Sequence, residues 1–332
     1  MKQEYTLGNN AEKSLKLYIS GTKSQIDTEL AKLASGLTQL SLHPHVDYAL
    51  LSNGKRLRPL LVILSAESVG GKRNNVMHLA SAFELMHTAT LVHDDIIDGD
   101  ESRRGIPAVH KRWSVNEAIL AGDALIALAV RLAAEYGETI LKTVAQSALE
   151  LCDGEHRDIT SSLKAATRQQ YYKRIKEKSA SLFRSSTYCG ALAGGGNPTE
   201  TKELSAFGEN FGIAYQLKDD LLDWTRNGNL FLNDLRNGRT SLPIIHYYVT
   251  CSSSQKKHLE NMLDPLIEKK ESTEKDEAEE LRQVLKQAGS FNYCEKQIDE
   301  YLRQAVDSIS DLRNTEYKLY LNEMAETLKA MT

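Results

Sequence analysis

The chain carries the same acidic pattern, Asp-Asp-x-x-Asp, at two places. Its six aspartates are Asp94, Asp95, Asp98, Asp219, Asp220 and Asp223. Residues four apart share one face of a helix, so the outer aspartates of each pattern should project together. Carboxylates near the carboxyl end of a helix oppose its dipole and repel one another. Hard divalent cations prefer oxygen ligands, and Mg²⁺ is often held by carboxylates together with substrate phosphates. The repeated pattern therefore predicts a magnesium site for a phosphorylated substrate.

The main alternative is that both patterns are acidic helix ends in contact with water. A single pattern of this kind is usually no more than that. Here the neighbouring residues are apolar, which predicts helices buried on most of their circumference and favours a paired site facing across a helical bundle. An EF-hand is excluded because no glycine-centred calcium loop is present. These apolar neighbours are Leu91, Val92, Ile96, Ile97, Leu217, Leu221, Leu222 and Trp224.

Basic residues stand close to both acidic patterns in the sequence. Arginine binds phosphate oxygens through two parallel hydrogen bonds, and lysine acts as a point charge. Each basic group alone is more often a surface feature, and only the placement beside the acidic patterns favours a phosphate site. No Walker A motif or Rossmann fingerprint occurs, so a nucleotide is not the obvious ligand. The basic residues are Lys55, Arg56, Arg58, Arg103, Arg104, Lys178 and Arg239.

The elements that must position these residues are predicted to be helices. Six prolines in 332 residues is a low count, and no glycine- and proline-punctuated series of short strands appears. A polar break is expected at His43–Pro44, a loop at Gly105 and Pro107, a turn at 193–196, and a charged loop with a helix start at 267–279. Apolar spacing predicts helices over about 11–37, from Pro59 to Gly70, from Asn74 into the first pattern, and over 115–135, 138–162, 168–193 and 201–225. Helices are expected again from the charged run at 267–279 to the end of the sequence.

Composition sets limits on the class of protein. The chain is 41% hydrophobic and 26% charged, with 45 acidic against 41 basic residues. No basic excess exists, so general nucleic-acid binding is not expected. No secretory signal and no run of about 20 apolar residues occurs, which predicts no transmembrane segment. Four scattered cysteines indicate reduced thiols and a cytoplasmic protein. We expect one domain over 1–332, with the motifs in about 50–245.

Taken in order, these motifs resemble those of the trans-polyprenyl diphosphate synthases, the family of farnesyl and geranylgeranyl diphosphate synthases. The motifs are GKRLRP, the helix with Glu84 and His87, HDDIIDGDESRRG, KSA, QLKDDLLD and NDLRNGR. The resemblance implies an all-α bundle of long antiparallel helices around a deep central cavity, usually in a homodimer. It also implies magnesium, with three ions per active site. The implied reaction joins isopentenyl diphosphate head-to-tail to dimethylallyl, geranyl or farnesyl diphosphate.

The resemblance assigns a role to each matching residue. Asp94, Asp98 and Asp219 would hold magnesium, supported by the other three aspartates. Ser179 and Gln216 would line the path of the carbocation, and the released diphosphate would accept the proton. The isopentenyl diphosphate would be bound by Lys55, Arg58, His87 and Arg104. The allylic diphosphate would be bound by Arg103, Lys178 and Arg239.

The sequence departs from the family pattern at several positions on the allylic side. A lysine usually found before the NDL segment is replaced, because the pair there is Gly228–Asn229. Arg226 is a candidate to compensate for its charge. Leu232 stands at a usual glycine, Ser179 at a usual threonine, and Arg239 at a common lysine. These changes bear on how the allylic diphosphate is held and not on the reaction class.

Residues before the first aspartate pattern predict the product length. In the family, bulky residues four or five positions before Asp94 close the cavity, and here these positions are Thr90 and Ala89. The next bulky residue is Met86, eight positions before Asp94. Moving the cavity floor from the fifth position to Met86 would deepen the cavity by about 4.5 Å. We therefore expect a geranylgeranyl, geranylfarnesyl or longer product. Residues near 125–128 or 149–152 are alternative floors.

Two other functions remain as alternatives. A class I terpene cyclase shares the fold and one acidic pattern, but it has no use for Lys55, Arg58 and His87 as an isopentenyl diphosphate site. A non-catalytic subunit of a heteromeric synthase tends to lose one acidic pattern, and both are intact here.

Overall fold

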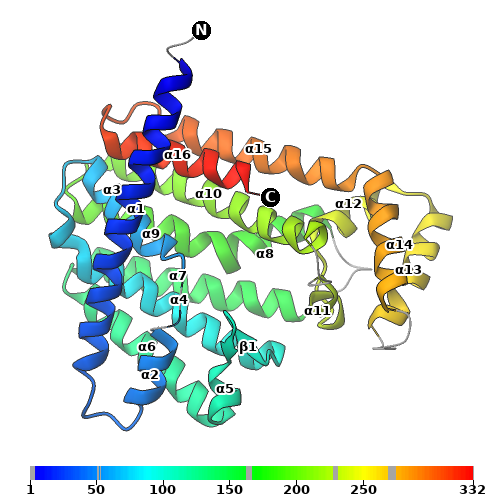
Figure 1. The fold of residues 1–332 in the computed structure, drawn as a ribbon, viewed down its shortest axis with the longest axis horizontal. Helices are drawn as coiled ribbons and strands as arrows, with labels where there is room; N and C mark the ends of the chain where they lie inside the picture. The colour runs from blue at the N-terminus through cyan, green and yellow to red at the C-terminus, as the bar shows by residue number, and fades with distance from the viewer. Residues whose placement is uncertain are drawn as a thin grey trace. The chain divides into compact units, whose positions relative to one another are not determined.

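The computed structural model describes residues 4–50, 52, 54–161, 167–226, 231–267 and 274–331. Within these ranges the chain is almost entirely helical (Figure 1). One short antiparallel hairpin pairs β1 (Ser102–Arg103) with β2 (Ile106–Pro107). The prediction of an all-α protein is confirmed. The helices are α1 (Glu4–Ser35), α2 (His43–Leu50), α3 (Leu57–Ser68), η1 (Arg73–Val76), α4 (Met77–Asp98), α5 (Val109–Arg112), α6 (Val115–Ala134), α7 (Glu138–Ile159), α8 (Arg168–Ile175), η3 (Lys176–Ala180), α9 (Ser181–Ala193), α10 (Pro198–Thr225), α11 (Phe231–Arg236), α12 (Leu242–Thr250), α13 (Ser253–Ile267), α14 (Glu274–Gln287), α15 (Ser290–Ser308) and α16 (Glu316–Ala330).

The chain divides into two compact units, each made from separate stretches of sequence. The first unit comprises Met1–Ala148, Leu182–Gly208 and Ser308–Met324. The second comprises Leu149–Ser181, Glu209–Asp307 and Ala325–Thr332. The first aspartate pattern lies in the first unit and the second pattern in the second. A single domain over 1–332 stays a prediction.

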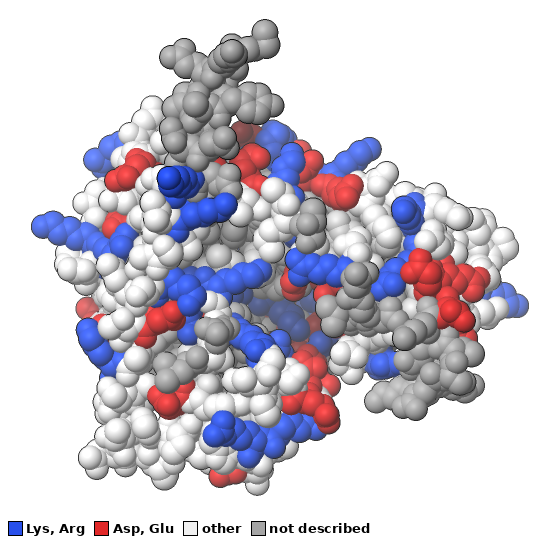
Figure 2. Space-filling model, in the orientation of Figure 1, with Lys and Arg blue, Asp and Glu red and all other residues white. Residues whose placement is uncertain are grey.

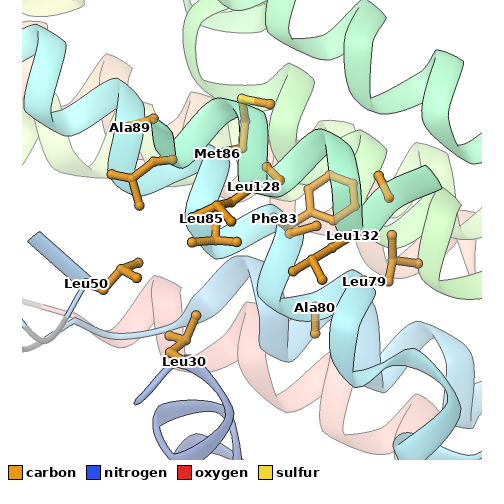
Figure 3. Close-up of a cluster of buried hydrophobic side chains, with 14 of the residues drawn as sticks. Leu30, Leu50, Leu79, Ala80, Phe83, Leu85, Met86, Ala89, Leu128 and Leu132 are labelled. Carbon is orange, nitrogen blue, oxygen red and sulfur yellow. The ribbon is translucent and has the colours of Figure 1, made fainter. Parts of the chain in front are cut away.

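Helix α4 is the central element of the first unit. Every residue from Leu79 to Met86 is buried, as expected for a helix enclosed on most sides. It packs against α6 along much of its length, and the two helices share one hydrophobic cluster (Figure 3). Met86, Ala89 and Leu128 belong to that cluster. The acidic end of α4 is therefore held by a large apolar interior.

The second unit has its own core, built around the end of α10. Trp224, one residue after the second aspartate pattern, stacks on Phe231 with the ring centroids 3.9 Å apart. The indole N–H of Trp224 donates a hydrogen bond of 2.8 Å to Ser241 Oγ. Leucines of α13 and α14 complete the cluster. The second acidic helix end is thereby anchored on both its apolar and its polar side.

Three local predictions differ from the structure. Residues His43–Leu50 form α2 instead of a polar break, because Pro44 stands in a first turn where its missing N–H costs nothing. The helix expected over 168–193 is interrupted by a π-helical turn at Lys176–Ala180. The segments Phe231–Arg236 and Leu242–Thr250, for which we predicted no element, are helices. Of the charged run at 267–279, residues 268–273 lie outside the described residues, and the predicted helix start is found at Glu274, where α14 begins.

Charged side chains of both signs are interspersed over the face shown in Figure 2. This mixture agrees with the near balance of 41 basic and 45 acidic residues. Across the described ranges, no helix combines the length and apolar character needed to span a bilayer.

Candidate active site

His87 and three of the arginines predicted to bind substrate, Arg58, Arg103 and Arg104, belong to one basic region of the first unit. Burial lowers the pKa of His87 well below its usual value, and the charges of Arg58, Arg104, Arg56 and Arg103 lower it further. At neutral pH the imidazole is uncharged, so it can donate one hydrogen bond to a ligand oxygen.

Arg104 reaches the segment that precedes α3. Its Nη1 donates a hydrogen bond of 3.1 Å to Ser52 Oγ. A Cβ atom added to Gly54 would lie 2.7 Å from the same Nη1, so the arginine passes directly over this glycine. Lys55 follows Gly54 and is exposed. The hairpin and the GKRLRP segment, about 50 residues apart in sequence, thus form one basic surface.

Arg58 is positioned by an aromatic ring. Its guanidinium carbon lies 4.4 Å from the centroid of Phe183, within the range of a cation–π contact. Phe183 is completely buried in α9. The contact holds a half-buried cation at the start of α3 while its charge remains in the basic region around His87.

The three aspartates of the first pattern are not equivalent. Asp95 is 2% exposed and accepts hydrogen bonds from Arg103, with Arg103 Nε at 2.7 Å. Asp94 and Asp98 are half-buried and, four residues apart, project to the same side of the helix. The structure therefore pairs Arg103, predicted to bind the allylic diphosphate, with the middle aspartate, and also with Asp100.

The second pattern has the same asymmetry. Both oxygens of its middle residue, Asp220, accept hydrogen bonds, from the Tyr171 hydroxyl at 2.6 Å and from Gln216 Nε2 at 2.8 Å. The Ser179 hydroxyl donates to Gln216 Oε1 at 2.6 Å. Ser179 and Gln216, which we predicted to act together, are therefore in contact. Asp219, one residue before Asp220, is exposed.

Negative charge is crowded around the second pattern. Burial raises the pKa of Asp220 to about 6, and burial together with the charges of Asp219, Asp234 and Asp220 raises the pKa of Asp223 to about 7. The pKa of Asp234 is also raised to about 6, by burial and by Asp220. A divalent cation would relieve this repulsion, and the donors are the carboxylate oxygens that Mg²⁺ prefers.

The donor set therefore fits magnesium, although the side chains do not yet enclose an ion. Among the residues that the structure describes, no three His, Cys, Asp or Glu side chains converge closely enough to hold a metal by themselves.

The predicted cations of the second unit are paired with two carboxylates of α7. Lys178 Nζ lies 2.6 Å from both Glu155 Oε2 and Asp158 Oδ2. Arg239 Nε lies 2.9 Å from Asp158 Oδ2. Burial alone would raise the pKa of Asp158, but the charges of Lys178, Arg174 and Arg239 hold it below its usual value. The cluster is a compact set of matched charges.

A π-helical turn directs the side chains of Lys178 and Ser179 toward two different helices. The turn spans Lys176–Ala180, and such turns are frequent at functional sites. Within it Lys178 points to α7, and Ser179 points to Gln216 of α10. Helix α7 approaches the turn very closely at Gly154, where a Cβ atom would lie 2.4 Å from Lys178 N. Only glycine permits this approach without displacement.

The residues predicted to set product length are on α4. Ala89 and Met86 are 0% and 2% exposed and belong to the cluster shared with α6. Thr90 is half-buried, and its hydroxyl donates to His87 O at 2.8 Å. Their effect on the product stays a prediction.

Sequence reasoning missed several residues that the structure brings into these clusters. Glu155 and Asp158 were visible only as an acidic pair at helical spacing after Gly154. Asp234 was noted only as part of the NDLRNGR motif and given no role, and Arg174 carried no signal beyond its charge. Tyr171 lies five residues before the π-turn, and no periodic pattern could assign it to Asp220. Of the noted departures, Gly228–Asn229 lies outside the described residues, whereas Arg226 is near enough to lower the pKa of Asp223.

The all-helical fold, with an aspartate pattern and a group of cations in each unit, is that of the isoprenoid synthases. A family model of polyprenyl synthetases matches residues 40–284. The chain is 34% identical to a geranylgeranyl diphosphate synthase of Sulfolobus acidocaldarius over 274 residues, which is 79% of this chain and 81% of that protein.

Two further comparisons agree. A short chain isoprenyl diphosphate synthase of Methanothermobacter thermautotrophicus is 30% identical over 310 residues, covering 90% of this chain and 93% of that protein. The crystal structure of a geranylgeranyl pyrophosphate synthetase from Pyrococcus horikoshii matches with a TM-score of 0.84 and 28% identity, covering 96% of this chain and 99% of that one. The chain belongs to the polyprenyl synthetase family and is a prenyltransferase.

The close approach at Gly154 yields a prediction for catalysis. In Gly154→Ala the added methyl group would overlap Lys178, so the turn must shift and carry Lys178 and Ser179 with it. A displacement of about 1 Å can cost about 100-fold in rate, and we expect a loss of that order in kcat. Steady-state kinetics of the purified variant measures it.

The matched control is Gly21→Ala in α1, where nothing lies within 4 Å of an added Cβ. Its kcat should equal that of the wild type. Equal kcat values for the Gly154 variant and the wild type, with both proteins folded by circular dichroism, would show that the close approach is irrelevant to catalysis.

Proposed function

We propose that this protein condenses isopentenyl diphosphate head-to-tail with an allylic diphosphate, namely dimethylallyl, geranyl or farnesyl diphosphate. The observation that carries the proposal is the basic region around His87 in the same unit as the first aspartate pattern. A terpene cyclase has no need of a second diphosphate site. The names of the two relatives, a geranylgeranyl and a short chain isoprenyl diphosphate synthase, support the same reaction.

The two diphosphates would bind to different groups of residues. Isopentenyl diphosphate would bind to Lys55, Arg58, His87 and Arg104, which the hairpin and the segment before α3 hold together. The allylic diphosphate would bind to Lys178 and Arg239, whose positions are set by Glu155 and Asp158. Arg103 would join it from the first aspartate pattern.

Magnesium would be held by Asp94, Asp98 and Asp219, supported by Asp95, Asp220 and Asp223, with three ions in each active site. When bound, Mg²⁺ neutralises the negative charge of the departing diphosphate. The middle aspartates support the site indirectly, because Asp95 orients Arg103 and Asp220 orients Gln216.

The chemistry follows from these residues without a protein base. The allylic carbon–oxygen bond breaks, and its electron pair leaves with the diphosphate. The double bond of isopentenyl diphosphate attacks the allylic cation, and a carbon–carbon bond forms. The resulting cation loses a proton from the neighbouring carbon to the released diphosphate, and the electron pair of that carbon–hydrogen bond becomes the new double bond. Ser179 and Gln216 would present neutral dipoles to the cation, oriented by their mutual hydrogen bond.

We further propose that the enzyme is a cytoplasmic homodimer. Each subunit would be a single domain whose helices surround a deep central cavity. Helix α6 exposes a row of large apolar side chains, which favours a protein interface. The four cysteines are free thiols, as expected in a reducing compartment. The exposed residues of α6 are Val115, Ile119, Leu120 and Val130.

The dimer is tested by a charge in the exposed row. Leu120→Glu should convert the protein to monomers in analytical ultracentrifugation, because a buried unpaired carboxylate is costly. Val249→Glu changes an equally exposed apolar residue of α12 and should leave the dimer intact. A wild-type protein that sediments as a monomer would rule the dimer out.

The reaction itself is tested by an elongation assay. With labelled isopentenyl diphosphate, Mg²⁺ and each allylic primer, the wild type should form longer prenyl diphosphates. Asp94→Ala should lower turnover by about 100-fold or more, since it removes a metal ligand. Asp264→Ala, at an exposed aspartate of α13, should have wild-type activity.

The products are sized after dephosphorylation. An absence of magnesium-dependent elongation with every primer would refute the synthase proposal, and a cyclic hydrocarbon from a single allylic substrate would replace it with a cyclase.

For product length we propose a geranylgeranyl, geranylfarnesyl or longer chain, limited along α4. In Ala89→Phe a ring would stand where a buried methyl group now packs near Met86 and Leu128. The principal product should become shorter by at least one five-carbon unit, measured by chromatography of the alcohols. Ala134→Phe, at the exposed end of α6, is the control. An unchanged product distribution in Ala89→Phe would mean that another helix sets the length.

A further inference from the structure

Arg56 is buried between the two residues proposed to bind isopentenyl diphosphate, Lys55 and Arg58, and points away from both. The backbone of Arg56 is left-handed, with φ 52 and ψ 38. Residues other than glycine rarely adopt this conformation. The residue is 5% exposed, whereas Lys55 is exposed and Arg58 half-buried. The left-handed turn thus sends one cation of the GKRLRP segment inward.

The guanidinium of Arg56 is bound on all sides. Its Nη1 donates to Glu84 Oε1 at 2.6 Å, and its Nε donates to Asp27 Oδ1 at 2.8 Å. Its Nη2 donates to the carbonyl oxygens of Leu50 and Ser52 at 2.9 and 3.2 Å. Four charge-assisted hydrogen bonds of this kind outweigh the cost of the left-handed backbone.

Each partner belongs to a different element. Glu84 is 1% exposed on α4 and stands three residues before His87, on the same face of the helix. Asp27 lies on α1, where Lys23 also binds it at 2.6 Å. Leu50 ends α2, and Ser52 is the residue that accepts a hydrogen bond from Arg104. One side chain therefore joins α1, α2 and α4 to the segment before α3.

We propose that Arg56 is a positioning residue for the isopentenyl diphosphate site, which it serves without touching the substrate. Through Glu84 it fixes Lys55 and Arg58 relative to His87, and through Ser52 it fixes them relative to Arg104. Asp27 carries the same restraint to α1. This inference rests on the proposed function, since it names the residue that preorganises one of its two diphosphate sites.

A purely structural role predicts a different result. Arg73 also joins α1 to its neighbours, because it lies 3.1 Å from Glu67 of α3 and stacks on Tyr18 at 4.8 Å. Its side-chain partners in the described part of the chain are Glu67, Gln25 and Tyr18, and none of them belongs to the GKRLRP segment. Loss of either arginine would loosen α1, but only the Arg56 contacts should affect the isopentenyl diphosphate site.

The test compares Glu84→Gln, Asp27→Asn and the control Arg73→Lys in the full-length protein. Glu84→Gln keeps the shape of the side chain and removes the charge that orients Arg56. We expect its KM for isopentenyl diphosphate to rise about tenfold or more, the loss of one charged hydrogen bond, with the KM for the allylic diphosphate unchanged. Asp27→Asn, at a partly exposed residue, should give the same selective change on a smaller scale.

Titration calorimetry with isopentenyl diphosphate alone gives a readout that does not depend on turnover, and the Kd should rise in parallel. Arg73→Lys should leave both KM values and this Kd unchanged. Equal changes in both KM values, or a fall in kcat alone, would show that Arg56 only supports the fold and would overturn the inference. A wild-type protein without elongation activity would instead refute the proposed function.

Discussion

Buried charge must be matched by opposite charge, and both groups of functional residues depend on this condition. Arg56 is neutralised by Asp27 and Glu84, and Lys178 is neutralised by Glu155 and Asp158. An unpaired charge in either place would cost several kcal/mol. These pairs fix the geometry before any ligand binds. Under the proposed function, carboxylates of the protein would thereby preorganise the cations that meet the diphosphates, so that little reorganisation is needed when charge develops in the reaction.

Much of the fold followed from the sequence because its helices are long and apolar on one or more faces. Periodicity located α4, α6, α7 and α10 within a few residues, and it placed the end of α1 well but its start seven residues too late, at 11 instead of Glu4. It failed where the cause is local. Pro44 looked like a break but begins α2, and nothing in the spacing of residues 168–193 marks a turn of different pitch. That turn depends on a contact with Gly154, which is distant in sequence.

The candidate site was predictable in its residue types but not in the division of their roles. Aspartates in one pattern are equivalent in a sequence. In the structure, Asp95 and Asp220 accept hydrogen bonds from Arg103, Tyr171 and Gln216, and the exposure of the six aspartates ranges from buried Asp95 to exposed Asp219. Likewise, Arg56 reads as one more phosphate-binding cation, yet it is buried among carboxylates. Tertiary contacts decide such questions, and one sequence does not contain them.

The hairpin after α4 shows how little structure is needed to join two groups of residues. Arg103 is the last residue of β1, whereas Arg104 begins the turn of the hairpin with a left-handed backbone, φ 55. The two side chains diverge, one to Asp95 at the end of α4 and the other to Ser52 before α3. The two are adjacent and cannot be moved independently. A displacement of Arg103 at the end of α4 therefore also displaces Arg104 beside Ser52, and the reverse, because one peptide bond joins the two residues.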